Sequence, residues 1–137
     1  SKRLPSLGKT VDLKNQIPVG TEIVANRSLL TWAIENIIRN SIDAIEGEKG
    51  MIMLTLIKEN QQVFIRIKDN GCGIPKKDWK NIFRPGFTSK KTGWGLGLSL
   101  SQRIIEDMHG GRLKVLDSVI GEGATFEIRF SENGDDE

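Results

Sequence analysis

Three side chains that carry oxygen recur at helical spacing in the first third of the chain. Asn36, Asn40 and Asp43 stand four and then three residues apart in ENIIRNSIDAI, and at about 100° per residue this spacing places them on one stripe of a helix. Asparagine and aspartate are poor interior helix residues because their side chains compete for backbone hydrogen bonds. The stripe is either a solvated polar face or a site for a hard cation such as Mg²⁺, held together with substrate phosphates.

A second candidate set is the segment DNGCGIP, residues 69 to 75, which follows an apolar β-strand pattern. An ionised Asp69 can only accept hydrogen bonds, which suits a ligand amine such as the exocyclic amino group of adenine. Guanine has a carbonyl at that position and would leave the carboxylate unpaired. Gly71 and Gly73 would permit positive φ and close approach of the backbone. For this segment alone, a simple Asn-Gly turn remains the alternative.

A third set lies in the glycine-rich and lysine-rich stretch FTSKKTGWGLGLSL. Gly93, Gly95 and Gly97 precede and open a predicted helix, whose N-terminal amides suit phosphate oxygens, and Lys90 and Lys91 add positive charge. The glycine spacing matches neither the Rossmann nor the Walker pattern. For this stretch alone, a flexible glycine loop without a ligand remains the alternative.

The elements that position these sets follow from hydrophobic periodicity. A helix is predicted over LLTWAIENIIRNSIDAI, capped by Asn26 or Ser28 and ended by Gly47, and a second over LGLSLSQRIIEDMHGG. Extended segments are predicted around TVDL and GTEIVA, with one hairpin of MIMLTLIKE and VFIRIKD and another of RLKVLDS and ATFEIRF. The predicted fold class is therefore α/β (α+β): a two-layer sandwich with a mixed, mostly antiparallel sheet covered on one face by about three helices.

Length and composition limit the alternatives. A chain of 137 residues fits one domain, which we place at residues 10–131, with a linker at 1–9 and an acidic disordered tail at 132–137. The net charge of +2 is too small to indicate nucleic acid or an anionic membrane as a partner. One Cys and one His exclude an internal disulfide and a structural zinc site.

Taken together, the three sets resemble the ATP-binding domain of the GHKL family, which gyrase, heat-shock chaperones, histidine kinases and mismatch-repair ATPases share. The resemblance is greatest to the catalytic and ATP-binding domain of bacterial two-component sensor histidine kinases. ENIIRNSIDAI is similar to the N box, DNGCGI to the G1 box, IFRPGFTSK to the F box and GWGLGLSLSQRII to the G2 box, over residues 26–130. This resemblance implies a Bergerat-type ATP-binding fold.

The resemblance also implies roles for individual residues. Asn40 would coordinate Mg²⁺, Asn36 and Lys90 would be the catalytic residues at the phosphates, and Asp69 would bind the adenine amino group. Phe83 and Phe87 would anchor a mobile ATP lid. The implied nucleotide-binding residues are Asn36, Asn40, Asp69, Gly71, Gly73, Ile74, Phe87, Thr88, Lys90, Gly95, Leu96, Gly97, Leu98 and Thr125, with Ala124 as the alternative to Thr125.

The implied function is transfer of the γ-phosphate of Mg-ATP to a histidine on an adjoining dimerisation domain, with a response regulator as the downstream partner. Residues 1–9 would then trail from the upstream dimerisation and phosphoacceptor helices. We expect a cytoplasmic location, no contact with nucleic acid or membrane, and a monomeric domain within a homodimeric parent. Family members that hydrolyse ATP carry glutamate where this chain has Asn36, so slow hydrolysis is expected. His109 is interpreted as a helix C-terminal residue and not as the phosphoacceptor.

Two other functions remain open from the sequence. One is a GHKL protein-serine kinase of the anti-sigma-factor type, which would phosphorylate a serine of a partner. The other is a non-catalytic module that senses a nucleotide or binds a protein. Acid stability of the phosphoprotein separates the first from a histidine kinase, and a lack of Mg²⁺-dependent ATP binding would favour the second.

Overall fold

The computed structural model describes residues 2–6, 9–16, 27–47, 49–87 and 97–131. In this part of the chain six strands form one sheet in the order β1-β2-β3-β4-β6-β5. The strands are β1 (Lys2–Ser6), β2 (Lys9–Asn15), β3 (Lys49–Glu59), β4 (Gln62–Asp69), β5 (Arg112–Val119) and β6 (Gly123–Ser131). β2 and β3 pair in parallel and the other neighbours pair antiparallel, which confirms the predicted mixed, mostly antiparallel sheet.

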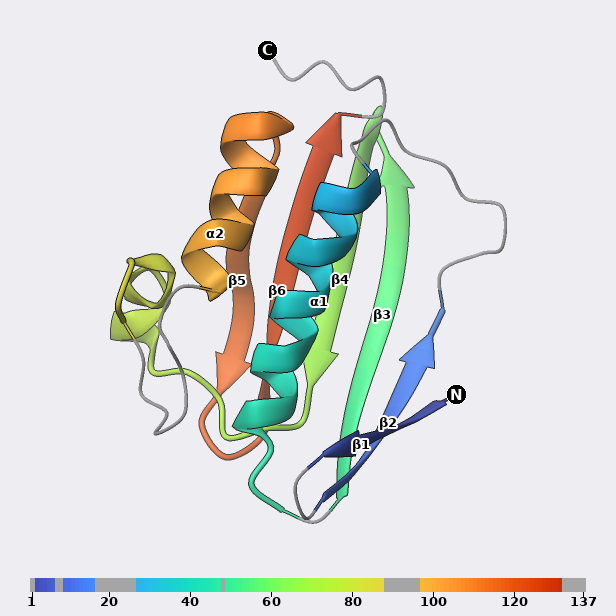
Figure 1. Cartoon of the computed structure of the whole chain (residues 1–137), viewed down its shortest axis with the longest axis vertical. Coiled ribbons are helices and arrows are strands. Elements are labelled where there is room, and N and C mark those ends of the chain that lie inside the picture. Colours follow the sequence, from blue (N-terminus) through green and yellow to red (C-terminus); the bar gives the residue numbers. More distant parts are fainter. Residues whose placement is uncertain (1, 7–8, 17–26, 48, 88–96, 132–137) are drawn as a thin grey trace.

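The helices lie together on one face of this sheet (Figure 1). They are α1 (Arg27–Ala44) and α2 (Gly97–Arg103), and α2 continues into a π-helical turn (Ile104–Met108). Two short 3-10 helices, Lys76–Asp78 and Asn81–Phe83, follow β4. The predicted two-layer α/β arrangement is therefore confirmed.

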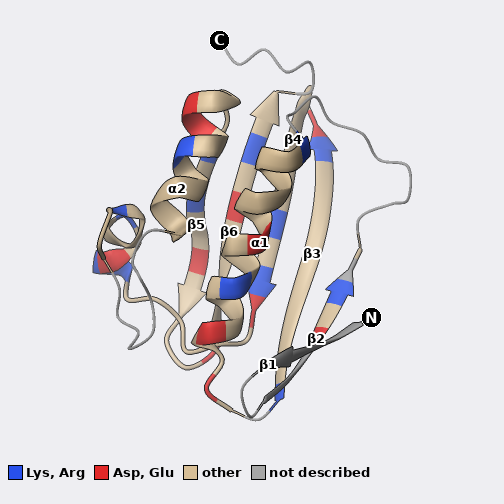
Figure 2. Ribbon diagram, in the orientation of Figure 1, with Lys and Arg blue, Asp and Glu red and all other residues tan. Residues whose placement is uncertain are grey.

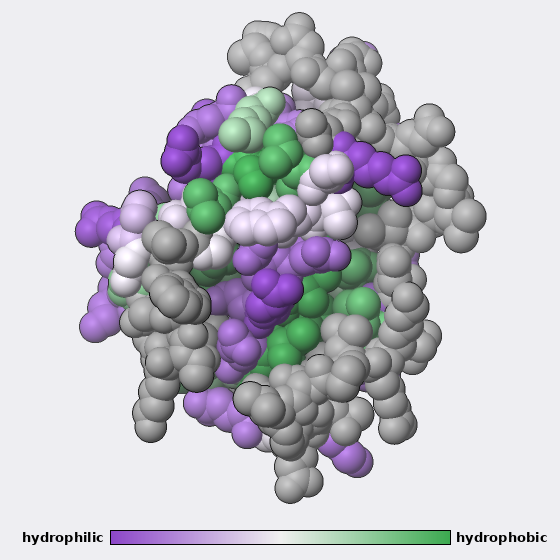
Figure 3. All heavy atoms as spheres, in the orientation of Figure 1, coloured by the Kyte–Doolittle hydropathy of each residue, from purple (hydrophilic) through white to green (hydrophobic). Residues whose placement is uncertain are grey.

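The core fills the space between the helices and the sheet. α1 buries Leu30, Ala33 and Ile37 against alternate residues of the strands, among them Ile52 on β3 and Ile67 on β4. Both predicted hairpins are present, β3 with β4 and β5 with β6. In β4 the alternation of apolar residues matches the alternating burial of its side chains. The polar residues of α1 form a band along its outer side, with apolar side chains on either side of the band (Figure 3).

The ends of α1 differ from the prediction. Ser28 lies within the first turn and does not cap the helix, Asn26 lies outside the described residues, and the helix ends at Ala44 and not at Gly47. The physical reason at the C-terminal end is non-local, because the Ala44 carbonyl accepts a hydrogen bond from the backbone N–H of Cys72 at 2.9 Å. A contact from a distant loop thus closes the helix.

The N-terminal segment forms a strand where the sequence predicts a linker. Residues Lys2–Ser6 pair antiparallel with β2 as the outermost strand of the sheet. Pro5 is compatible with this position because an edge strand can leave one side of its backbone without ladder partners. The predicted extended segment at GTEIVA lies outside the described residues.

The second helix matches its prediction in extent and in its end. Its helical turns run from Gly97 to Met108, and the N–H groups of Gly110 and Gly111 donate to the carbonyls of Glu106 and Ile105 at 3.1 and 2.8 Å. Gly110 has φ of +67°, a conformation that favours glycine. The HGG sequence therefore ends this helix as predicted.

Charges of both signs are distributed over the described elements. Figure 2 shows basic and acidic residues on α1, on α2 with its π turn, and on β6. In the part of the chain that the structure describes, no helix is long and apolar enough to cross a membrane.

Candidate functional site

Asp69 is the last residue of β4, and it lies on the helix-covered face of the sheet. The residue is only 4% exposed, and its register partner is the buried Ile52 of β3. The carboxylate oxygen Oδ1 accepts hydrogen bonds from the backbone N–H of Gly71 at 2.8 Å and of Ala124 at 3.2 Å. Because a buried carboxylate is stable only when its oxygens are paired, these two amides fix its position at the end of the strand.

The loop after Asp69 lies directly against the C-terminal end of α1. The Cys72 N–H donates to the Ala44 carbonyl, and a Cβ atom at Gly71 would lie 2.8 Å from that same carbonyl oxygen. A side chain at Gly71 would therefore push the loop off the helix. This close approach is to the helix, and the approach of Gly71 to a ligand stays a prediction.

The turn between β5 and β6 holds the loop from another side. Gly73 has φ of +82°, and a Cβ atom there would lie 2.5 Å from the Val119 carbonyl oxygen. The Gly121 N–H donates to the Cys72 carbonyl at 2.8 Å, and Gly123 lies so near the Asp69 carbonyl that a Cβ would overlap it. Glycine is therefore required by sterics at both Gly73 and Gly123.

Asn70 connects the loop to β3. Its Oδ1 accepts from the Met51 N–H at 2.8 Å, and its own N–H donates to the Met51 carbonyl at 3.3 Å. The segment DNGCGIP is thus held by α1, by β3 and by the β5–β6 turn. A loop fixed from three sides can present a carboxylate with little loss of conformational entropy on binding a ligand.

The polar stripe of α1 lies beside the first turn of α2. Asn36 and Asn40 are half-buried, whereas Asp43 is exposed. The Asn36 Nδ2 donates to the Trp32 carbonyl at 2.8 Å, and a Cβ atom at Gly97 would lie 3.1 Å from the Asn36 Oδ1. The structure therefore brings Asn36 to the start of α2, with Leu98 next along that helix and also half-buried. Asn40 lies one turn further along α1.

The F-box aromatic residues lie in different surroundings. Phe83 is 7% exposed and packs edge-to-face on Phe126, with ring centroids 6.3 Å apart. Phe87 is half-buried and its N–H donates to the Arg84 carbonyl at 3.1 Å. Thr88, Lys90, Gly95 and Leu96 lie outside the described residues, so their predicted roles stay predictions.

Thr125 lies away from Asp69. The antiparallel register pairs it with Lys68, whose side chain points to the open face of the sheet, whereas Ala124 is buried on the face of Asp69. Ala124 also donates its N–H to Asp69. Ala124, the alternative position, thus occupies the place predicted for Thr125, because neighbouring residues of a strand face opposite sides.

Ser41 was missed by sequence reasoning. It is fully buried on α1, and its hydroxyl is a buried side-chain polar atom without a hydrogen-bond partner in the described structure. It lies one turn before Ala44, on the helix face that meets the Gly71 loop. A buried hydroxyl left unpaired costs about 1–3 kcal/mol, so a bound ligand or water is the ordinary explanation for such an atom. An orphan hydroxyl is visible only in three dimensions, and the sequence carried no signal for it.

Trp79 supports the end of the loop. Its indole Nε1–H donates to the Ile74 carbonyl at 2.9 Å, and both side chains are half-buried. We expect Trp79→Phe to lower the free energy of unfolding by about 1 kcal/mol, because the ring is kept and one hydrogen bond is lost. Urea denaturation measures this, with Trp32→Phe as the control because Trp32 is 40% exposed. Equal losses in both variants would contradict the role of this bond.

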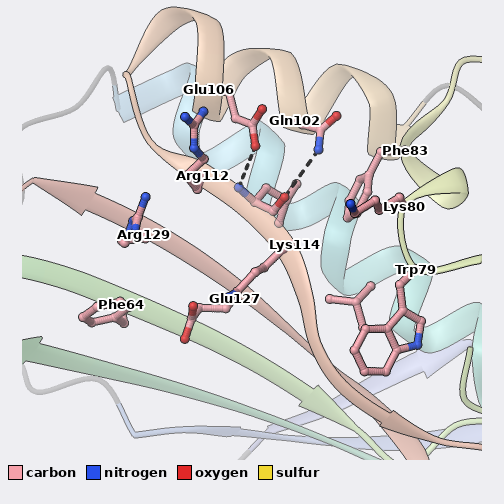
Figure 4. Close-up of a pocket in the computed structure, with 12 residues that line it drawn as sticks. Phe64, Trp79, Lys80, Phe83, Gln102, Glu106, Arg112, Lys114, Glu127 and Arg129 are labelled. Atoms are coloured by element: carbon pink, nitrogen blue, oxygen red, sulfur yellow. Dashed lines mark hydrogen bonds between the residues drawn. The ribbon is translucent and has the colours of Figure 1, made fainter. Parts of the chain in front are cut away.

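A separate pocket of about 680 Å³ lies along β5, the edge strand of the sheet opposite β1 (Figure 4). Leu113 donates its N–H to Glu106 Oε2 at 3.1 Å and accepts from Gln102 Nε2 at 3.4 Å. The two helix side chains thus occupy backbone groups that an edge strand would otherwise expose to another chain. Asn36, Asn40 and Asp69 do not line this pocket, so it is distinct from the candidate site.

This arrangement defines a class of protein: an α/β sandwich with a buried strand-end carboxylate, a glycine loop fixed beneath it, and a helical asparagine beside the start of a second helix. The family model described as histidine kinase-, DNA gyrase B-, and HSP90-like ATPase matches residues 25–134. The chain belongs to this ATPase family. Membership indicates ATP as the ligand, and it confirms the resemblance found in the sequence.

Relatives with known names agree with this assignment. The chain is 42% identical over 117 residues to the signal transduction histidine-protein kinase AtoS of Escherichia coli (strain K12), covering 85% of this chain and 18% of the relative. It is 34% identical over 127 residues to the adaptive-response sensory kinase SasA of Parasynechococcus marenigrum (strain WH8102), covering 88% and 32%. The chain thus spans less than a third of each of these relatives.

Solved structures confirm the fold. A catalytic domain of histidine kinase ThkA in a nucleotide-free form superposes with a TM-score of 0.78 and 29% identity, covering 93% of this chain and 82% of that one. A structure of ThkA in complex with the response regulator protein TrrA matches with a TM-score of 0.74 and 27% identity, over 90% and 35% of the two chains.

Proposed function

We propose that this chain is the ATP-binding catalytic domain of a sensor histidine kinase, which binds Mg-ATP and donates the γ-phosphate to a histidine on an adjoining dimerisation domain. The observation that carries the proposal is the buried Asp69, held at the strand end by the N–H groups of Gly71 and Ala124. The names of the relatives support the reaction type.

Base selection is assigned to Asp69. A carboxylate accepts hydrogen bonds and cannot donate them, so it can pair with the adenine amino group. Guanine has a carbonyl at that position and offers the carboxylate no donor. Because both backbone amides donate to Oδ1, the orientation of the carboxylate is set before the base arrives. Gly71 and Gly73 keep the backbone close against its neighbours, and we place the base beside this loop.

The phosphate end is assigned to α1 and to the segment that leads into α2. Asn36 presents its amide oxygen near Gly97 and Asn40 lies one turn further along α1, and a single amide ligand completed by phosphate and water oxygens fits Mg²⁺. The described residues contain no group of three or more His, Cys, Asp or Glu side chains that could hold a metal ion alone, which agrees with a metal that arrives with the nucleotide. Bound Mg²⁺ would neutralise phosphate charge during transfer.

The remaining assignments at the phosphates follow the family resemblance. We assign to Lys90 a contact with the γ-phosphate. Thr88, Gly95 and Leu96 are assigned to the lid and its hinge. Asn36 is assigned a place beside the phosphates, where its amide cannot activate a water molecule. Ser41 adds an orphan polar atom one turn from the loop, which suits a water or polar group of the bound nucleotide.

The phosphoacceptor is assigned to another segment. His109 is the single histidine of the chain, and its Nδ1 lies 2.8 Å from the Ile104 carbonyl oxygen while the ring packs edge-to-face on Phe130. These contacts give the His109 ring a structural role at the end of the helix. We therefore propose that a dimerisation and phosphoacceptor segment supplies the nucleophilic histidine.

The proposed partners and place in the cell follow from the relatives. One structural relative is in complex with a response regulator protein, and we propose that a response regulator receives the phosphoryl group in the present case too. We further propose a cytoplasmic location, a homodimeric parent and a monomeric isolated domain.

The proposal is tested by phosphorylation with γ-labelled ATP and Mg²⁺, using this chain joined to, or mixed with, a histidine-bearing dimerisation segment. We expect a labelled product that is lost in acid and kept in alkali, as phosphohistidine is. A label that survives acid would indicate a serine kinase instead, and no label with intact ATP binding would indicate a nucleotide-sensing module.

Hydrolysis by the isolated domain should be slow. Asn36 is half-buried and cannot serve as a general base, because an amide does not take up a proton at neutral pH. We expect hydrolysis at least 100-fold slower than phosphotransfer to the histidine segment, since general-base catalysis contributes about 10²–10⁴-fold. Phosphate release by the isolated domain is compared with the rate at which label enters the histidine segment, and release as fast as that transfer would contradict the prediction.

A further inference from the structure

Ser118 bonds two segments that the candidate site needs in a fixed relation. Its Oγ accepts a hydrogen bond from the Ile74 N–H at 2.7 Å and donates to the Gly123 carbonyl at 3.0 Å. Ile74 closes the loop that begins at Asp69, and Gly123 begins β6. One hydroxyl therefore joins the loop to the strand through both its donor and an acceptor lone pair.

A β-bulge places Ser118 on the side where these partners lie. From Val115 to Ser118 the chain takes three steps along β5, while the register partners Phe126 and Ala124 are two steps apart on β6. The extra residue changes the face to which the following side chains point. Ser118 thus lies opposite the buried Ala124, on the helix-covered face, and the exposed Asp117 does not.

The contacts form a closed circuit around the base-binding carboxylate. Ser118 bonds Ile74 and Gly123, Gly123 precedes Ala124, and Ala124 donates its N–H to Asp69 Oδ1. Loss of the Ser118 hydroxyl opens this circuit and leaves the Ile74 N–H, which is part-buried, without the partner it has in the structure. The Asp69 carboxylate is chemically unchanged, but one of the contacts that fix its orientation is lost.

We propose that Ser118 is a positioning residue for base recognition, acting through the Asp69 loop and not by touching the nucleotide. This inference rests on the proposed function, because it takes Asp69 as the adenine-binding group. The circuit predicts that the hydroxyl affects binding at the base and leaves the Mg²⁺-dependent part of binding unchanged.

The test compares Ser118→Val with Ser118→Thr, which have nearly the same shape and differ in the hydroxyl. We expect Ser118→Val to weaken ATP and ADP binding alike by about three- to tenfold, the equivalent of one lost hydrogen bond, and Ser118→Thr to restore most of it. The ratio of ATP affinities with and without Mg²⁺ should equal that of the wild type. Asp117→Asn is the matched control, because Asp117 is the exposed neighbour in the same strand.

Amide hydrogen exchange gives a readout that a change in overall stability does not mimic. The Ile74 amide should exchange faster in Ser118→Val than in Ser118→Thr, relative to core amides such as that of Ile67. If Ser118→Val does not fold, Ser118→Ala is measured in the same two ways.

The outcomes separate this inference from the proposed function. Wild-type affinity for ATP in Ser118→Val, together with lost affinity in Asp69→Asn, would overturn the role of Ser118 and leave the proposed site standing. An equally weak Ser118→Thr would also overturn it, since the hydroxyl would not matter. Wild-type affinity in Asp69→Asn would remove the proposed site, and with it this role for Ser118.

Discussion

Replacing Asp69 with asparagine should weaken ATP binding by roughly 30-fold to 1,000-fold while the domain stays folded. The amide oxygen of asparagine can still accept from the Gly71 and Ala124 N–H groups that now bond Oδ1. The second oxygen becomes an amino group, which meets the adenine amino group donor against donor. One lost hydrogen bond and an unpaired buried donor together cost about 2–4 kcal/mol, which corresponds to roughly 30-fold to 1,000-fold in affinity.

Calorimetric titration measures this change, and thermal melting of each variant shows whether the fold is kept. Asp107→Asn is the control, because Asp107 is exposed on the π turn and its ion pair with Arg103 is long, at 4.0 Å, and exposed to solvent. Binding of ATP by Asp69→Asn with wild-type affinity would remove Asp69 from base recognition.

Replacing Asn40 with alanine should remove the benefit of Mg²⁺ and lower phosphotransfer by about 100-fold or more. Asn40 is the proposed protein ligand of the metal, and a metal that neutralises phosphate charge contributes several kcal/mol to such a reaction. Binding of the base should remain, because Asn40 lies on α1 and Asp69 lies on β4.

The measurement is the ratio of ATP affinities with Mg²⁺ and with a chelator. In the wild type Mg²⁺ should raise affinity, and in Asn40→Ala the ratio should approach one. Thr31→Ala, an exposed change on the same helix, should leave the ratio as in the wild type. A normal ratio in Asn40→Ala would place the metal ligand elsewhere.

Much of the fold could be predicted because its signals are local. The strict alternation in VFIRIKD and the helical spacing of Leu30, Ile37 and Ile45 predicted which faces are buried. Gly73 of DNGCGIP has the positive φ that its residue type allows, whereas the approach of Gly71 and Gly73 to a ligand stays a prediction. Local patterns were sufficient to predict an element where the spacing of apolar residues alone determines which face is buried.

The rest depends on contacts between distant segments. The end of α1 at Ala44 is set by Cys72, and the face of Ser118 is set by a bulge two residues before it. Thr125 carries the more obvious polar group, yet the register turns Ala124 and not Thr125 toward Asp69. The orphan hydroxyl of Ser41 likewise depends on what surrounds it. Contacts between segments that are distant in the sequence cannot be predicted from local sequence patterns.

The most direct test of the central claim is calorimetric titration of the domain with a non-hydrolysable ATP analogue and with its GTP counterpart, each with and without Mg²⁺. The geometry of Asp69 predicts binding of the adenine compound alone, strengthened by Mg²⁺. Equal binding of both nucleotides would contradict base selection by Asp69, and no binding of either would contradict the kinase function proposed for this chain.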